Sequence, residues 1–221
     1  NTYKKPEQQR WYSGETISLG IGQGYNNFTM LQIAHAMGTV ANNGLKMKPH
    51  LVREVVDVET KASTLVAKEP VGQLPLLPEN LEVIKKGMVG VNIEGTSATS
   101  FIGAQYVSAG KTGTAQVFTV KQNEKYNAST IDERMRDHAL FVAFAPADDP
   151  KVALAMVVEN AGFGAQNAAP IARRVFDFVI MGQYPSQEDI EAVQKGQATR
   201  PIGKPRAVAS VPWPPKAAEL A

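Results

Sequence analysis

Two apolar runs in the C-terminal half constrain the fold of this chain most strongly. Residues Ala139–Ala145 and Val152–Val158 contain no polar side chain. Short apolar runs bounded by turn residues are typical of buried β-strands. The link between them, Pro146–Pro150, consists of two prolines, two aspartates and an alanine, and proline and aspartate favour turns. The sequence therefore predicts an antiparallel hairpin of buried strands.

Three other segments have the apolar spacing of amphipathic helices. The first runs from Thr29, a candidate N-cap, to a stop at Asn43-Gly44; the second covers about 79–91, and the third ends near Gly182. Their apolar positions are Met30, Ile33, Ala34, Met37 and Ala41; Leu81, Ile84, Met88 and Val91; and Ile171, Ala172, Val175, Phe176, Val179 and Ile180. Such helices packed on an antiparallel sheet predict an α+β fold.

The rest of the chain predicts less regular structure. Residues 1–27 are rich in polar residues and glycine, which indicates a loop that leads into a tight turn at Gly20–Gly24. A β-branched run over 49–59 predicts a strand with 65–67 as its hairpin partner, followed by a Pro-rich link over 69–78. We expect one domain over 1–184 and a flexible, Pro-rich tail over 185–221.

Composition excludes several classes of function. The chain has 221 residues, 43% of them hydrophobic, which is ordinary for a globular protein. A net charge of +2 argues against a nucleic-acid-binding surface. Three histidines without ligand spacing indicate no metal site, the glycines at 20–24 lack a phosphate-loop continuation, and we expect no cofactor. No apolar run approaches the roughly 18–20 residues of a membrane span.

One stretch, Val107–Val117, combines strand-like ends with unusual central residues. In a strand Lys111 and Gly113 point to one face, and Thr112 and Thr114 to the other. A lysine suits an anionic group, hydroxyls donate hydrogen bonds to a carboxylate, and a glycine in a strand often marks close approach of a backbone or ligand. Outward backbone N–H groups can pair with an extended peptide. The stretch therefore predicts a site for a peptide that ends in a carboxylate.

The tripeptide Lys111-Thr112-Gly113 is also a known motif. K-T-G occurs with S-x-x-K and S-D-N in serine penicillin-binding proteins and class A β-lactamases. Alone it is weak evidence, because Lys-Thr-Gly also suits a turn. The polar segment 121–137 that follows is long for a hairpin turn, and long ordered loops are often functional. Within it Tyr126, Asn127, Arg134 and Arg136 either line one end of a cleft or form a solvated loop.

Four segments together resemble one family in sequence and in order. The chain is similar to the penicillin-binding protein 2 family, the elongation-specific class B D,D-transpeptidases of bacterial cell walls, from about Trp11 to Gln183. The segments that carry the resemblance are GIGQGY at 20–25, MLQIA at 30–34, AGKTGTAQVF at 109–118 and RDHALFVAFAP at 136–146.

The resemblance implies a penicillin-binding fold and roles for matching residues. Lys111 is expected to keep the cleft electropositive and to support proton transfer, and Thr112 and Thr114 to bind the terminal carboxylate of a peptidoglycan stem peptide. The backbone N–H of Thr114 is expected to be one oxyanion-hole donor. Gly113 and Ala115 complete the substrate-binding strand, and β-lactams are expected to acylate the same site.

The same resemblance requires a nucleophile that this sequence does not offer. The one S-x-x-K match, Ser108–Lys111, overlaps the strand, whereas the family pair lies on a helix where both side chains share a face. There is no S-x-N match. We therefore expect this sequence to be the C-terminal part of a longer transpeptidase domain, inactive alone, whose other half supplies the serine. The resemblance also implies a membrane anchor and a pedestal domain upstream. It implies a location at the periplasmic face of the inner membrane and an elongation-machinery glycosyltransferase as a further partner.

Two alternatives stay open at this point. K-T-G does not distinguish transfer from hydrolysis, so a β-lactam-hydrolysing or β-lactam-sensing relative is the nearer alternative. The other is a non-catalytic module that uses the Lys111 strand to hold a peptide. Rapid penicillin turnover favours the first, and an upstream half without S-x-x-K favours the second.

Overall fold

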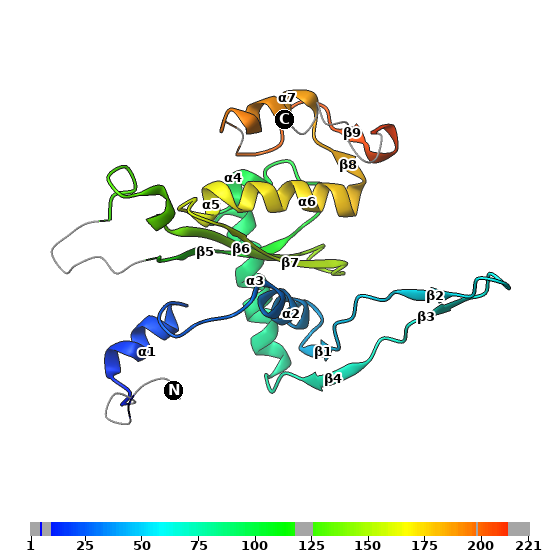
Figure 1. The fold of residues 1–221 in the computed structure, drawn as a ribbon, viewed down its shortest axis with the longest axis horizontal. Coiled ribbons are helices and arrows are strands. Elements are labelled where there is room, and N and C mark those ends of the chain that lie inside the picture. The colour runs from blue at the N-terminus through cyan, green and yellow to red at the C-terminus, as the bar shows by residue number, and fades with distance from the viewer. Residues whose placement is uncertain (1–4, 6–9, 118–125, 198, 212–221) are drawn as a thin grey trace.

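A three-stranded antiparallel sheet lies at the centre of the structure (Figure 1). Its strands are β5 (Ala109–Ala115), β6 (His138–Ala145) and β7 (Val152–Val158), with β6 in the middle. The predicted hairpin is confirmed, since β6 and β7 pair in antiparallel register along the whole length of β7. The computed structural model describes residues 5, 10–117, 126–197 and 199–211.

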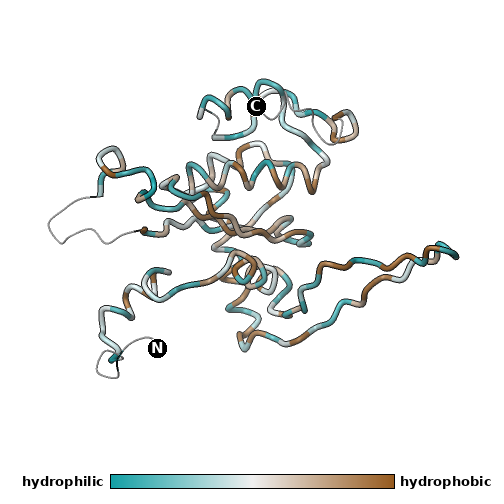
Figure 2. Tube along the Cα trace, viewed as in Figure 1, coloured by the Kyte–Doolittle hydropathy of each residue, from teal (hydrophilic) through white to brown (hydrophobic). Residues whose placement is uncertain are grey.

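Helices cover both faces of this sheet. One face carries α4 (Ala98–Phe101), α5 (Gly164–Asn167) and α6 (Ala169–Met181), and the other carries α2 (Met30–Ala41) and α3 (Pro78–Ile93). Figure 2 shows hydrophobic residues along the strands of this sheet and at intervals along the helices. The predicted α+β fold is confirmed. The larger core cluster contains Phe101, Ala139, Phe141, Ala143, Ala145, Ala168, Ala169, Ala172 and Phe176, and the smaller one Ala41, Ala109 and Phe144.

The helices begin and end near the predicted residues. Thr29 is the N-cap of α2: its hydroxyl accepts from the Gln32 N–H, and the Gln32 side chain accepts from the Thr29 N–H at 2.9 Å. Gly182 ends α6 in the left-handed conformation. The predicted apolar stripes are only partly right, because Ile84 is 43% and Val179 52% exposed. These helices bury a narrow strip on a small sheet, so the edges of each stripe remain accessible.

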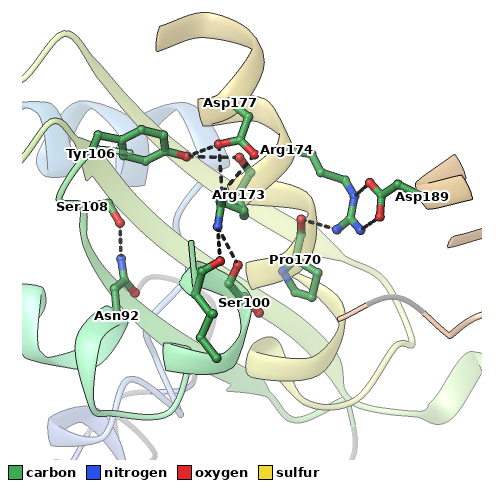
Figure 3. Close-up of polar contacts among 10 residues, drawn as sticks. Asn92, Ser100, Tyr106, Ser108, Pro170, Arg173, Arg174, Asp177 and Asp189 are labelled. Carbon is green, nitrogen blue, oxygen red and sulfur yellow. Dashed lines mark hydrogen bonds and ion pairs between the residues drawn. The ribbon is translucent and has the colours of Figure 1, made fainter. Parts of the chain in front are cut away.

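A buried polar cluster joins α4 to α6. The guanidinium of Arg173 donates to both carboxylate oxygens of Asp177 and to the carbonyls of Ser100 and Ile102 (Figure 3). Tyr106 donates to Asp177 at 2.8 Å, and burial together with that carboxylate raises the pKa of the Tyr106 phenol above its ordinary value. The phenol therefore stays protonated, and the segment between α4 and β5 is fixed on α6.

The N-terminal third differs from the sequence prediction. Where a loop was predicted, residues Ser13–Gly20 form α1, whose start is closed by a hydrogen bond from the Tyr12 N–H to the Glu15 carboxylate. None of the residues of α1 is buried. A helix that buries no face needs no apolar stripe, so the spacing of apolar residues did not predict it. The tight turn after it is confirmed, with Gly22 and Gly24 at positive φ.

A single arm extends away from the sheet, with a two-stranded ladder near its base and a hairpin toward its tip (Figure 1). The predicted strand over 49–59 shortens to β2 (Glu54–Val56), which pairs with β3 (Ser63–Leu65). The predicted Pro-rich link contains an unpredicted strand, β4 (Pro70–Gln73), which pairs with β1 (Leu45–Met47). The prolines in this segment led to the prediction of a link without a strand. Proline is, however, tolerated at the first position of a strand, and Pro70 occupies that position in β4.

The C-terminal segment is folded where we expected flexibility. It comprises β8 (Gln183–Tyr184), α7 (Gln187–Gln194), β9 (Arg206–Ala207) and the 3₁₀ turn η3 (Val208–Ser210). Arg174 on α6 holds the fully buried Asp189 of α7 through bonds of 2.6 and 2.8 Å (Figure 3). Composition does not reveal such a pair. Residues 198 and 212–221 lie outside the described residues, and the boundary at 184 stays a prediction. Among the described residues, no helix has the length and apolarity needed to cross a bilayer.

We predict that Asp189→Ala releases the C-terminal segment. Removing one partner leaves the Arg174 charge without its carboxylate, which costs about 3 kcal/mol or more at a buried pair. Limited proteolysis should cut within 186–211 much faster, while the circular dichroism of the rest of the protein stays unchanged. Glu188→Ala, at an exposed position one residue away, is the matched control. Equal cleavage of both variants contradicts the prediction.

Candidate functional site

The Lys111 strand, β5, lies at one edge of the sheet. It pairs with β6 from Ala109 to Ala115, and in the part of the chain that the structure describes no strand pairs with its other side. Side chains of opposed residues share a face: Thr112 lies opposite Phe141 and Thr114 opposite Ala139. Both hydroxyls therefore lie on the face covered by α6, and Lys111 lies on the other.

The central side chains of β5 differ in exposure. Lys111 is exposed, and its ammonium donates to the carbonyl of Thr112 at 2.8 Å. Thr112, Gly113, Thr114 and Ala115 are half-buried. The alternation predicted from the sequence thus gives a strand with a cation on one face and two hydroxyls on the other.

The glycine-rich turn after α1 contacts the end of this strand. The side-chain amide of Gln23 donates to the Thr114 carbonyl at 2.7 Å, and its oxygen accepts from the Gln116 N–H at 3.4 Å. In an antiparallel strand the N–H and C=O of one residue point the same way, and they alternate between sides. Thr112 and Thr114 therefore direct their backbone groups outward. Sequence reasoning missed Gln23; the only signal was an amide flanked by two glycines.

Glycines allow other segments to pack closely against β5. A Cβ on Gly164, at the start of α5, would overlap the Leu140 carbonyl oxygen and lie 2.6 Å from that of Gly113. A Cβ on Gly110 would lie 2.6 Å from Phe141 and 3.1 Å from the Asn92 side chain. The close backbone approach expected at Gly113 is thus made by Gly164, and this contact restrains the position of the strand.

Three buried polar residues form a chain of hydrogen bonds next to the start of β5. The Asn92 amide donates to the Ser108 hydroxyl at 2.9 Å (Figure 3), and Ser97 donates to the Asn92 oxygen at 2.6 Å. Ser108 is 3% exposed, whereas Lys111 is exposed. Residues three apart in an extended chain point to opposite faces. This geometry favours the interpretation that the Ser108–Lys111 match to S-x-x-K is coincidental.

The loop residues proposed for the cleft lie before β6. The Tyr126 hydroxyl accepts from the Asp137 N–H at 3.1 Å, and the Arg136 guanidinium donates to the Ala128 carbonyl at 3.1 Å. The Arg134 carbonyl accepts from the Asn160 side chain. These contacts stabilise the loop beside the Ala115 end of β5, since Ala115 lies opposite His138. A role in binding stays a prediction, and residues 118–125 lie outside the described residues.

Comparison with known proteins gives one consistent family. Residues 2–177 match the penicillin binding protein transpeptidase domain. The peptidoglycan D,D-transpeptidase MrdA of Haemophilus influenzae is 42% identical over 196 residues. That match covers 84% of this chain but only 28% of the relative. The chain therefore spans well under half the length of the curated relative it matches.

Solved structures agree with this result. Penicillin-binding protein 2 of Pseudomonas aeruginosa superposes with a TM-score of 0.61 at 37% identity, covering 77% of this chain and 34% of that one. Penicillin-binding protein A of Mycobacterium tuberculosis, solved as a ceftriaxone acyl-enzyme, gives 0.60 at 29%, covering 74% and 35%. A Helicobacter pylori penicillin-binding protein 2, solved with MreC, gives 0.59 at 26%, covering 80% and 29%.

We predict that Gly164→Ala loosens the support of β5. The new methyl group meets backbone oxygens that no side-chain rotation can move, so we expect a loss of about 1–3 kcal/mol in the free energy of unfolding. Gly87→Ala is the matched control, because that position in α3 has open space and alanine favours helix by about 0.5–1 kcal/mol. Urea denaturation measures both. A Gly164→Ala protein as stable as the parent contradicts the close packing described above.

Proposed function

The chain belongs to the penicillin-binding protein transpeptidase family, and on that premise we propose that the complete protein is an elongation-type peptidoglycan D,D-transpeptidase. In this proposal β5 forms the substrate-binding wall of the acyl-transfer site. The observation that carries it is an edge strand of sequence Lys-Thr-Gly-Thr that directs the N–H groups of Thr112 and Thr114 outward and carries two hydroxyls beside them, while the outward carbonyls accept from Gln23 and Lys111. The 42% identity to a D,D-transpeptidase supports it independently.

Every residue from Lys111 to Ala115 has a role in this mechanism. The Lys111 ammonium attracts the anionic peptide and assists proton transfer. The hydroxyls of Thr112 and Thr114 donate to its terminal carboxylate. The outward N–H of Thr114 stabilises the oxyanion of the tetrahedral intermediate; loss of one such donor costs about 100- to 1000-fold in rate. Gly113 and Ala115 leave the strand edge accessible to the peptide.

The chemistry proceeds in two acyl-transfer steps. A serine hydroxyl attacks the carbonyl of the penultimate D-Ala, and the C-terminal D-Ala leaves as the free amine after taking up a proton. An amine of a neighbouring stem peptide then attacks the acyl-enzyme ester, forms the cross-link and releases the serine. The S-x-x-K serine and the S-x-N motif are supplied by residues beyond this sequence, so this chain alone should be inert. β-Lactams stop the cycle after the first step.

The relatives also support proposals about the partners, the location and the covalent ligands of the complete protein. The MreC complex of a Helicobacter pylori relative supports the proposal that the complete protein joins an elongation assembly, which includes a glycosyltransferase. We place the catalytic domain on the periplasmic face of the inner membrane, held by a segment outside this sequence. The ceftriaxone acyl-enzyme of another relative supports β-lactams as covalent ligands.

Intact mass spectrometry of the complete protein with penicillin tests this function. One stable drug adduct, mapped to a serine outside residues 1–221, is the expected result. Rapid loss of the adduct with release of hydrolysed drug favours the β-lactam-hydrolysing alternative. No adduct at any drug concentration favours the non-catalytic peptide-binding module and overturns the proposal.

We predict that Lys111→Ala in the complete protein lowers the rate of penicillin acylation by about 100-fold or more, the typical size of a proton-transfer contribution. The matched control is Lys86→Ala, which removes an exposed lysine on α3. Stopped-flow or gel-based acylation with a fluorescent penicillin measures both. Acylation by the Lys111→Ala variant at the parent rate removes Lys111 from the mechanism.

A further inference from the structure

A second threonine lies beside the substrate-binding strand. The hydroxyl oxygens of Thr96 and Thr112 are 3.0 Å apart, within hydrogen-bonding distance. Thr96 belongs to the turn between α3 and α4, fifteen residues before Lys111. Thr96 is exposed and Thr112 half-buried, so the pair lies where a ligand on the strand can reach it.

The turn that carries Thr96 is held firmly in place. Ser97 is 1% exposed, and its hydroxyl donates to the Asn92 side-chain oxygen at 2.6 Å and lies 3.1 Å from the Val91 carbonyl. Asn92 in turn donates to Ser108 at the start of β5 (Figure 3). A Cβ on Gly95 would lie 2.7 Å from the Cα of Val91, so the turn lies directly on α3. This buried network fixes Thr96 relative to β5, and a fixed neighbour can orient a hydroxyl.

The direction of the bond between the two hydroxyls decides what Thr112 can do. Each hydroxyl has one hydrogen to donate and two lone pairs to accept. If Thr112 donates to Thr96, its hydrogen is not available to a ligand. If Thr96 donates to Thr112, the Thr112 hydrogen is free, and accepting a bond makes it a stronger donor. A carboxylate accepts only, so its arrival favours the second arrangement.

We propose that Thr96 is a positioning residue for carboxylate recognition. Its hydroxyl donates to Thr112, and Thr112 donates to the terminal carboxylate of the stem peptide or to the carboxylate of a β-lactam. Thr96 thus selects for an anionic ligand without touching it. This inference rests on the carboxylate-binding role proposed above for Thr112.

The test compares a charged and an uncharged ligand on variants of the complete protein. Thr96→Val keeps the shape of the side chain and removes the hydroxyl, whereas Thr96→Ser keeps the hydroxyl. The readout is the ratio of acylation rate constants for benzylpenicillin and its methyl ester. We expect Thr96→Val to lower this ratio by about 2- to 10-fold, the size of one net hydrogen bond, and Thr96→Ser to restore it. A merely structural role lowers both rates equally and leaves the ratio unchanged.

Thr112→Val separates failure of this inference from failure of the proposed function. If Thr112→Val lowers the ratio and Thr96→Val does not, the role of Thr96 is overturned while the carboxylate role of Thr112 stands. If neither variant changes the ratio, the assignment of Thr112 fails, and that of Thr96 fails with it.

Discussion

The antiparallel pairing of β5 with β6 is the constraint on which the rest of the site depends. Its register sets Thr112 and Thr114 on one face, Lys111 on the other, and the backbone groups of the two threonines outward. A shift of one residue would exchange the faces and turn the hydroxyls toward α2 and α3. The register is fixed because β6 is itself held by β7 and by a core that includes the fully buried Phe141.

Two kinds of contact hold β5 in place: close backbone packing at Gly113, and hydrogen bonds at its start. Gly164 lets the start of α5 approach the Gly113 and Leu140 backbones, which restrains β5 without a side chain between them. Asn92, Ser97 and Ser108 tie the turn after α3 to the beginning of the strand. Such a network is worth most when every member is satisfied, and no buried side-chain polar atom among the described residues lacks a partner. The turn that carries Thr96 and the start of β5 are therefore held together by satisfied hydrogen bonds.

The sequence predicted the parts of the fold that follow from periodicity. The β6–β7 hairpin, α2 with its Thr29 cap, α3 and α6 appear close to the predicted residues, because each buries one face against the sheet. The exposed α1, the short β1–β4 ladder and the folded segment after Pro185 were missed, since none depends on a local apolar pattern. The Arg174–Asp189 pair joins residues of two different helices, and composition does not encode that pairing. At the site, motif spacing indicated Lys111 to Thr114. The contacts of Gln23 and Thr96 with this strand are tertiary, and only the structure reveals them.

The central claim is that β5 is the ligand-binding wall of an acyl-transfer site. A crystal structure of the complete protein acylated by benzylpenicillin tests it most directly. The account predicts the drug carboxylate within hydrogen-bonding distance of the Thr112 and Thr114 hydroxyls, the acyl carbonyl oxygen at the Thr114 N–H, and the ester on a serine outside this sequence. A drug bound away from β5, or an ester on Ser108, would contradict it.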